Sequence, residues 1–255
     1  MYQPFLNTRL KAVVAALAVS EASVFPGLIE VLEAAGQLKQ TQRAGWVRVG
    51  IAHPESVAAH SYRVAVLALL LGPRLGLNVE KLLRLALLHD LPEARVGDLT
   101  PADRVTPRDK HALESTAFAE IVGGLPEGPA LDALWREYAA NASPEARLVH
   151  QLDKLEMALQ ALEYERATSG TSKAVSGKSE VQSEETGARN QESVGESQEP
   201  GDETNRRWRR RRGGRTASRT AAGWADEFWA SARAALSEPL LIALYEHLSA
   251  LRPPR

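Results

Sequence analysis

Apolar residues at helical spacing recur through most of this chain, and this repetition limits the folds that it can adopt. Between residues 27 and 164, several segments each carry an apolar stripe, and turn or capping residues separate one segment from the next. Residues 79–88 form the densest segment, and we expect a central buried helix that ends before Pro92. Ala and Leu dominate the 44% of hydrophobic residues and aromatic residues contribute 5%, a composition that favours packed helices over a sheet. The sequence therefore predicts an all-α fold.

The neighbouring helices can be placed from their caps and stripes. The first carries an apolar stripe that we expect to face the core, made of Leu28, Val31, Leu32 and Ala35. Gly36 is expected to stop it. We expect the other helices at residues 56–72, 110–122, 131–140 and 143–165.

Residues 168–223 differ from the rest, because they contain few apolar side chains and are rich in Ser, Glu, Gly, Gln and Arg. Such a stretch cannot bury enough surface to offset the entropy of ordering it, so we expect a disordered insert. Apolar spacing resumes at Trp224, and we expect this last part to pack back on the first. The predicted division is an N-terminal extension at 1–26, a helical domain at 27–167, the insert at 168–223 and a C-terminal helical part at 224–252.

Charge, cysteine content and hydropathy exclude several classes of protein. The net charge of −1 shows no overall basic or acidic bias and so identifies no partner, and the absence of cysteine excludes disulfides and Cys-ligated zinc or iron–sulfur centres. No apolar run reaches the roughly 18 residues of a membrane span, so we expect no membrane association. Arg9 and Lys11 precede apolar residues 12–19, which fits either a short targeting segment or an ordinary Ala-rich helix. We expect a cytoplasmic protein, with nuclear or organellar targeting as the alternatives.

Two imidazoles and two carboxylates stand in segments that otherwise have the pattern of buried helix. His60 interrupts one expected helix, and Asp153 lies between leucines of another. His89 and Asp90 end the densest apolar segment. Each alone is typical of a capping residue or a hydrogen-bonded core histidine, but the set is hard to explain in that way. Buried carboxylates need a compensating positive charge, and imidazole and carboxylate are ordinary ligands of a divalent cation. The set points to a metal-dependent hydrolase.

Several short motifs accompany these residues in order along the chain. They are residues 36–39 (GQLK), 45–47 (GWV), 53–58 (HPESVA), 60–63 (HSYR), 85–90 (LALLHD), 96–98 (VGD), 101–103 (PAD), 134–138 (LWREY) and 151–157 (QLDKLEM), together with Glu93. In this order and spacing they resemble the HD-domain phosphohydrolases, and within that family the 5′-deoxynucleotidase branch. The similarity covers residues 27 to about 166 and the last helix. It implies an HD-domain helical bundle in which the insert precedes the last helix.

The resemblance also implies ligands and substrate contacts. It makes four residues the ligands of one divalent cation (Mn²⁺, Co²⁺, Mg²⁺ or Fe²⁺), namely His60, His89, Asp90 and Asp153. It places a second cation at Glu93, Asp98 and the main-chain carbonyl of Leu99. It implies nucleotide contacts from Trp46 and from the loop of Asp98, Leu99, Thr100 and Pro101.

The resemblance does not decide which basic side chain orients the phosphate. Bacterial members carry an arginine directly before the tryptophan, where this chain has Gly45. The nearest candidate is Arg43. Arg63 and Lys154 are further candidates.

The reaction implied is hydrolysis of deoxyribonucleoside 5′-monophosphates by in-line attack of water, without a covalent intermediate. Glu93 or Asp98 is expected to accept the proton of that water or to donate one to the departing 5′-oxygen. One alternative is a phosphohydrolase of the same superfamily that cleaves a cyclic nucleotide or a guanosine polyphosphate. Another is a nucleic-acid-binding protein that acts through the arginines between Arg206 and Arg219, a cluster that is also typical of a solvated tail. The resemblance suggests a homodimer.

Overall fold

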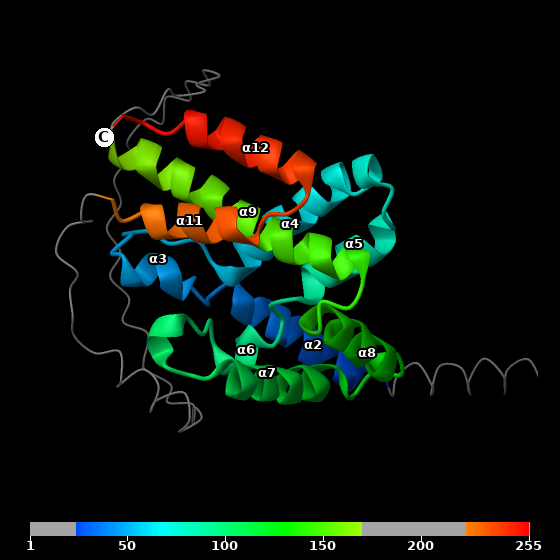
Figure 1. Ribbon diagram of the computed structural model, residues 1–255. Helices are drawn as coiled ribbons and strands as arrows, with labels where there is room; N and C mark the ends of the chain where they lie inside the picture. The colour runs from blue at the N-terminus through cyan, green and yellow to red at the C-terminus, as the bar shows by residue number, and fades with distance from the viewer. Residues whose placement is uncertain (1–23, 170–222, 255) are drawn as a thin grey trace, which may run out of the picture.

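The computed structural model describes residues 24–169 and 223–254, and within these ranges the chain is helical (Figure 1). The helices are α2 (Phe25–Leu38), α3 (Ala44–Arg48), α4 (Val57–Leu71), α5 (Val79–Leu88), α6 (Glu93–Val96), α7 (Pro107–Val122), α8 (Gly128–Ala139), α9 (Pro144–Thr168), α11 (Asp226–Ala235) and α12 (Pro239–Ala250). The all-α prediction is therefore confirmed. The predicted N-terminal extension at 1–26 and disordered insert at 168–223 fall almost wholly outside the described residues.

Most of these helices begin and end where their sequences predict. Ser56 and Ser143 cap α4 and α9, because each hydroxyl accepts a hydrogen bond from the backbone N–H three residues on, at 3.2 and 3.1 Å. α5 ends at Leu88, as the proline that follows predicts. α7 and α8 begin earlier than predicted, at Pro107 and Gly128, because a proline in the first turn extends each helix toward its N-terminus.

α9 is the central element of the bundle. It contacts α4, α5, α8, α11 and α12, and in Figure 1 it runs beside α11 and α12. Its buried residues belong to the larger of two apolar cores, together with residues of α4, α5, α11 and α12. The smaller core joins α2, α7 and α8 around Phe118, Ile121 and Trp135. Burial of these two cores is the main stabilising contribution to the fold.

The apolar stripe of α2 does not face the core as predicted. Leu28 and Leu32 are 42% and 60% exposed, whereas Gly27 and Ala34 are buried. Gly27 lies so close to the backbone of Gly124 that an added Cβ would approach it to 2.3 Å. A contact this close requires a small residue at Gly27. Ala34, Leu38 and the partly buried Val31 then pack against the smaller core, whereas Leu28 and Leu32 point outward.

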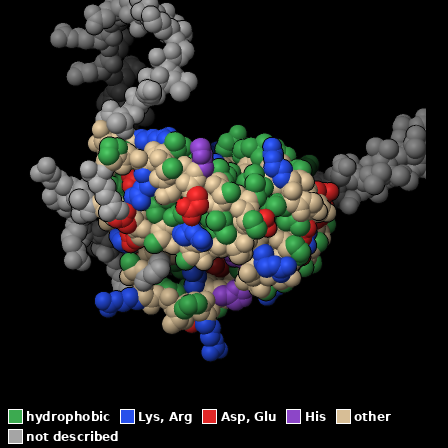
Figure 2. Space-filling view, turned by 45° about the horizontal axis from the view of Figure 1, so that its top comes forward, with side chains coloured by type: hydrophobic (Ala, Val, Ile, Leu, Met, Phe, Trp, Pro, Cys, Tyr) green, Lys and Arg blue, Asp and Glu red, His purple; other side chains and the backbone are tan. Residues whose placement is uncertain are grey.

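Exposed apolar residues are otherwise scattered over the described surface. On the face shown in Figure 2, apolar side chains alternate with basic and acidic ones, so neither charge sign dominates. Within the described ranges, no helix combines the length and the apolar character that crossing a membrane requires.

Candidate metal centre and substrate cavity

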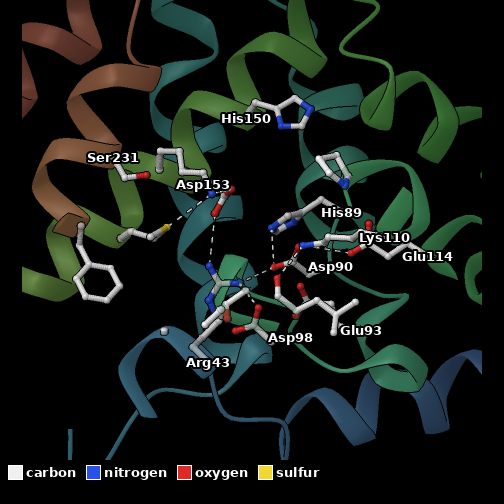
Figure 3. Close-up of a pocket in the computed structure, with 18 of the residues that line it drawn as sticks. Arg43, His89, Asp90, Glu93, Asp98, Lys110, Glu114, His150, Asp153 and Ser231 are labelled. Carbon is white, nitrogen blue, oxygen red and sulfur yellow. Dashed lines mark hydrogen bonds and ion pairs between the residues drawn. The ribbon is translucent and has the colours of Figure 1, made fainter. Parts of the chain in front are cut away.

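The four predicted ligands of one cation lie together, although three different helices carry them. His60 is on α4, Asp153 is on α9, and His89 and Asp90 follow the last turn of α5. Nε2 of His60 is 3.1 Å from Oδ1 of Asp153 and 3.7 Å from Oδ2 of Asp90. Nε2 of His89 is 3.1 Å from the same Oδ2 of Asp90. Figure 3 shows Asp153 on one side of this cluster and His89 and Asp90 on the other.

Helix packing explains why these side chains converge. α4 packs against both α5 and α9, and His60 and Asp153 stand on the faces that meet. Leu152, beside Asp153, is fully buried, which fixes the orientation of α9. The carbonyl of His89 accepts a hydrogen bond of 3.2 Å from the indole of Trp135, which holds the end of α5 against α8. The ligands are therefore held by rigid elements.

Several atoms that face the centre of the cluster lack a hydrogen bond. Nε2 of His60, Nε2 of His89 and Oδ1 of Asp153 are buried, and none has a well-oriented hydrogen-bond partner in the described part of the chain. Nδ1 of His89 lies 2.8 Å from the carbonyl of Ala86, a contact that places the ring proton on Nδ1. The lone pair of Nε2 is then directed into the cluster. Buried polar atoms without partners are costly, and a divalent cation would satisfy these donors, so the set fits such an ion.

Arg43 enters the same cluster from the segment before α3. Its guanidinium lies 3.3 Å from Oδ2 of Asp90, 3.9 Å from Oδ1 of Asp98 and 3.7 Å from Oδ1 of Asp153. Burial lowers the pKa of Arg43, but the three carboxylates outweigh burial and raise that pKa well above its usual value. The backbone N–H of Arg43 donates to the carbonyl of Glu55 at 3.0 Å, which fixes where the side chain starts. The charged guanidinium of Arg43 is thus held beside the predicted ligands.

The same charges set the protonation of the ligands. Burial and Arg43 lower the pKa of His60, but Glu156 and Asp153 outweigh them and raise it to about 9. Burial raises the pKa of Asp153, but Lys154, His60 and Arg43 outweigh burial and hold it well below its usual value. A cation that binds His60 must therefore displace a proton, so we expect cation binding to release protons.

Glu93, at the start of α6, faces the cluster. Its buried surroundings shift the pKa of its carboxyl group. The residue is 3% exposed, and its Oε2 has no hydrogen-bond partner in the described part of the chain. Burial, and then the carboxylates of Asp90 and Asp98, raise the pKa of Glu93 well above its usual value. Glu93 is therefore protonated more readily than an exposed glutamate.

Asp98 and Leu99 both have partners of their own. Oδ2 of Asp98 accepts a hydrogen bond of 2.6 Å from the backbone N–H of Ala44, at the start of α3. Nζ of Lys110, on α7, donates to the carbonyl of Leu99 at 3.1 Å. An ammonium group therefore contacts the carbonyl that the resemblance assigns to a second cation.

The other predicted nucleotide contacts lie along the walls of the site. The backbone N–H and the hydroxyl of Thr100 both donate to Oδ2 of Asp103 at 2.8 Å, and Pro101 begins the 3₁₀ turn that contains Asp103. Trp46 is 1% exposed, and its Nε1 donates to Oε1 of Glu55 at 3.0 Å. Thr100 is held by a turn, whereas Trp46 is a buried wall residue.

The two further phosphate candidates lie in different places. Nζ of Lys154 is 3.0 Å from Oδ2 of Asp153, and the side chain lines the cavity beside the ligands. Arg63 instead forms a forked pair with Glu163, with two contacts of 3.1 Å, and it is not among the cavity-lining residues in the described ranges. The structure thus brings Arg43 and Lys154 to the ligand cluster and leaves Arg63 outside the cavity.

The ligands open onto a cavity of about 830 Å³, which is within the range of small-molecule sites. One wall is the loop after Asp98 together with the start of α7. The opposite wall includes Glu227, Phe228 and Ser231 of α11, and Figure 3 shows Ser231 on this side, away from Lys110. The C-terminal segment therefore contributes directly to the cavity.

The sequence alone does not predict three parts of the site. Glu156 is fully buried against His60, and its signal was a carboxylate three residues after Asp153 within an apolar frame. The sequence predicts Lys110 only as the start of a helix, and its contact with the Leu99 carbonyl follows from the structure. The contribution of α11 gave no local signal, because residues distant in sequence bring it to the cavity.

The surroundings of Gly45 leave little room for a side chain at the position where bacterial members carry arginine. A Cβ at Gly45 would lie 3.1 Å from Cε1 of Phe228, whose ring packs 4.0 Å from that of Trp46. Replacing Gly45 with arginine should displace Phe228 and destabilise the protein by about 1–3 kcal/mol, the usual cost of overpacking. We expect a lower Tm in thermal unfolding.

Gly36 offers a matched control, because a Cβ there would meet no atom within 4 Å. Gly36→Arg should leave the Tm unchanged or raise it, since glycine is a poor helix former. An equal Tm for both variants would contradict the packing described for Gly45.

Comparisons with known proteins agree with this arrangement. A family model described as HD domain matches residues 35–194. The 5′-deoxynucleotidase HDDC2 of Homo sapiens is 45% identical over 140 residues, which cover 54% of this chain and 68% of that protein. The 5′-deoxynucleotidase hdd1 of Schizosaccharomyces pombe is 39% identical over 149 residues, or 56% and 75% of the two chains.

A solved structure shares the fold. It is a predicted metal-dependent phosphohydrolase from Magnetospirillum magnetotacticum, with a TM-score of 0.54 and 21% sequence identity. The match covers 89% of this chain and 94% of that one. At this identity the likeness concerns the fold alone.

Proposed function

The chain belongs to the HD domain family, and from this premise we propose that it is a metal-dependent 5′-deoxynucleotidase. It would hydrolyse deoxyribonucleoside 5′-monophosphates to a deoxynucleoside and phosphate. One observation carries the proposal: two imidazoles and two carboxylates converge with unpartnered, buried atoms beside a charged arginine. Relatives named 5′-deoxynucleotidase, at about 40% identity or above, support the substrate class.

The proposed cation site consists of His60, His89, Asp90 and Asp153. A divalent cation bound there supplies a Lewis acid that polarises the phosphate and activates water. The mixed nitrogen and oxygen donors suit Mn²⁺, Co²⁺, Fe²⁺ or Mg²⁺. Ligand atoms of His60, His89 and Asp90 lie within 4.8 Å of one another, an arrangement compatible with a divalent cation.

Arg43 is the residue that we assign to the phosphate. Its planar fork matches two phosphate oxygens, and its charge lies within 4 Å of the ligand carboxylates. Gly45, at the position of the bacterial arginine, has no side chain to take this role. Lys154, next to Asp153, can add a second positive charge at the cavity edge.

Glu93 is the proposed acid for the departing 5′-oxygen, because its raised pKa lets it hold a proton to donate. Asp98 is the proposed partner that accepts a proton from water, held in place by the backbone of Ala44. We retain Glu93, Asp98 and the Leu99 carbonyl as a proposed second cation site. A cation there would have to displace the Lys110 ammonium, which donates to the Leu99 carbonyl.

Sugar and base contacts are proposed for the opposite end of the cavity. Trp46 forms a rigid wall through its contacts with Glu55 and Phe228, and Leu99, Thr100 and Pro101 form the facing loop.

The homodimer and the cytoplasmic location stay predictions. The alternative of a nucleic-acid contact concerns the arginines between Arg206 and Arg219, which lie outside the described residues.

An assay of phosphate release tests the proposed function. We expect the full-length protein, supplied with Mn²⁺ or Co²⁺, to release phosphate from dAMP, dGMP, dCMP or dTMP faster than from the matching ribonucleotides. Treatment with a chelator should reduce turnover to background, and added cation should restore it. Turnover that survives chelation, or that is confined to cyclic nucleotides or guanosine polyphosphates, would contradict the proposal.

A further inference from the structure

A carboxylate that no expected role uses lies against the outer edge of the His60 imidazole. Glu156, on α9, is fully buried, and its Oε2 accepts a hydrogen bond from Nδ1 of His60. His60 is itself fully buried. The two side chains therefore contact each other directly in the interior between α4 and α9.

This contact determines which ring nitrogen of His60 is available to a cation. Because Glu156 accepts from Nδ1, the ring proton of the neutral imidazole resides on Nδ1. The lone pair then lies on Nε2, which faces Asp153 at 3.1 Å and Asp90 at 3.7 Å. Without Glu156, the ring could take the other tautomer or rotate, and Nε2 would no longer be a fixed ligand.

Arg63 secures Glu156 in this position. Nε of Arg63 lies 3.4 Å from Oε1 of Glu156. The same guanidinium donates to Oε1 of Gln160 at 2.6 Å and pairs with Glu163 at 3.1 Å, so it is anchored along α9. The arginine provides the positive charge that a buried carboxylate requires.

The same residues could be read as a separate cation site, since ligand atoms of Glu55, His60 and Glu156 lie within 4.8 Å of one another. Two contacts oppose that reading. The guanidinium of Arg63 already lies beside Glu156, and the indole N–H of Trp46 already donates to Glu55. A cation there would be repelled by the first group and would compete with the second.

We propose that Glu156 is a positioning residue that holds His60 in the tautomer and orientation needed for cation binding, with Arg63 as its support. This inference rests on the cation site of the proposed function. An outer hydrogen-bond partner of a ligating histidine typically changes cation affinity by about 10–100-fold. Glu156 should therefore affect the cation without contacting it or the substrate.

Two variants of the full-length protein test this, Glu156→Gln and Glu156→Leu. Glu156→Gln keeps the shape of the side chain and removes its charge. Glu156→Leu fills the same space and removes the hydrogen-bond acceptor of Nδ1 of His60. Co²⁺ binding is measured by calorimetry without nucleotide, together with the visible absorption spectrum of the bound Co²⁺. We expect affinity to fall by about 10–100-fold in Glu156→Leu and by less in Glu156→Gln, with a changed spectrum in both.

Glu165→Gln is the matched control. Glu165 is on the same helix and pairs with Arg252 at 2.6 Å, but it contacts none of the proposed ligands. It should bind Co²⁺ as the unmodified protein does. The inference is overturned if both variants fold and bind Co²⁺ with the affinity and the spectrum of the unmodified protein. If Glu156→Leu does not fold, the result for Glu156→Gln decides.

The two proposals fail in different ways. If the unmodified protein binds no Co²⁺ at all, the cation site of the proposed function is wrong. If it binds Co²⁺ and releases phosphate from deoxynucleotides while Glu156→Gln binds equally well, only the positioning role is wrong.

Discussion

Replacing Asp90 with asparagine should remove cation binding and phosphate release together. Oδ2 of Asp90 lies 3.1 Å from Nε2 of His89 and 3.7 Å from Nε2 of His60, so it is the atom that both imidazoles share. His89, Arg43 and His60 together outweigh burial and hold the pKa of Asp90 well below its usual value, so this carboxylate is ionised. Asparagine keeps the shape but removes the charge that a cation requires.

The expected size of this effect exceeds that of an outer hydrogen-bond partner, which is about 10–100-fold. We expect turnover to fall by on the order of 10³-fold or more, and cation affinity by at least about 100-fold. Phosphate release and calorimetric titration with Mn²⁺ measure the two quantities. Asp132→Asn is a suitable control, because Asp132 pairs only with Arg136 on the surface of α8 among its described ion pairs. An Asp90→Asn protein that keeps its cation and its turnover would show that Asp90 is not a ligand.

Arg43→Ala should separate the two properties that Asp90→Asn removes together. If Arg43 binds the phosphate, its loss should lower kcat/KM for a deoxynucleotide by roughly 10²–10³-fold, the usual cost of removing a donor that stabilises developing negative charge. Cation affinity should stay the same or rise. The reason is that the guanidinium lies within 4 Å of Asp90, Asp98 and Asp153 and repels a second positive charge there.

Two further variants sharpen this test. Arg43→Lys keeps the charge and loses the fork, so its kcat/KM should lie between those of the unmodified protein and Arg43→Ala. Arg95→Ala removes an arginine that pairs with Glu30 and Glu120 and does not line the cavity, and it should have no effect on turnover. Undiminished turnover in Arg43→Ala would exclude a role of Arg43 in phosphate binding. Loss of cation binding in this variant would instead show that Arg43 supports the structure of the cation site.

The helices and the ligand cluster could be predicted from the sequence because local chemistry decides them. Pro92 limits α5, and serine hydroxyls start α4 and α9. Polar residues within apolar frames then marked His60 and Asp153 as candidate ligands, since a buried imidazole or carboxylate needs a polar partner. Helical spacing was enough to place these side chains inward, and packing brought them together.

Features that depend on how helices meet could not be predicted in this way. The outward stripe of α2 follows from the contact between Gly27 and Gly124, which spacing along one helix does not reveal. The sequence offers Arg43 as the nearest phosphate candidate and Arg63 as a further one, but it cannot decide between them. The pairing of Arg63 with Glu163 on α9 separates them, and only the structure shows it.

Anomalous diffraction from crystals of the full-length protein grown with Co²⁺ tests the central claim most directly. The account predicts one strong anomalous peak within coordination distance of Nε2 of His60, Nε2 of His89 and carboxylate oxygens of Asp90 and Asp153. A Co²⁺ peak bound between Glu55 and Glu156 instead, or no peak at the four ligands in crystals that contain the cation, would contradict it.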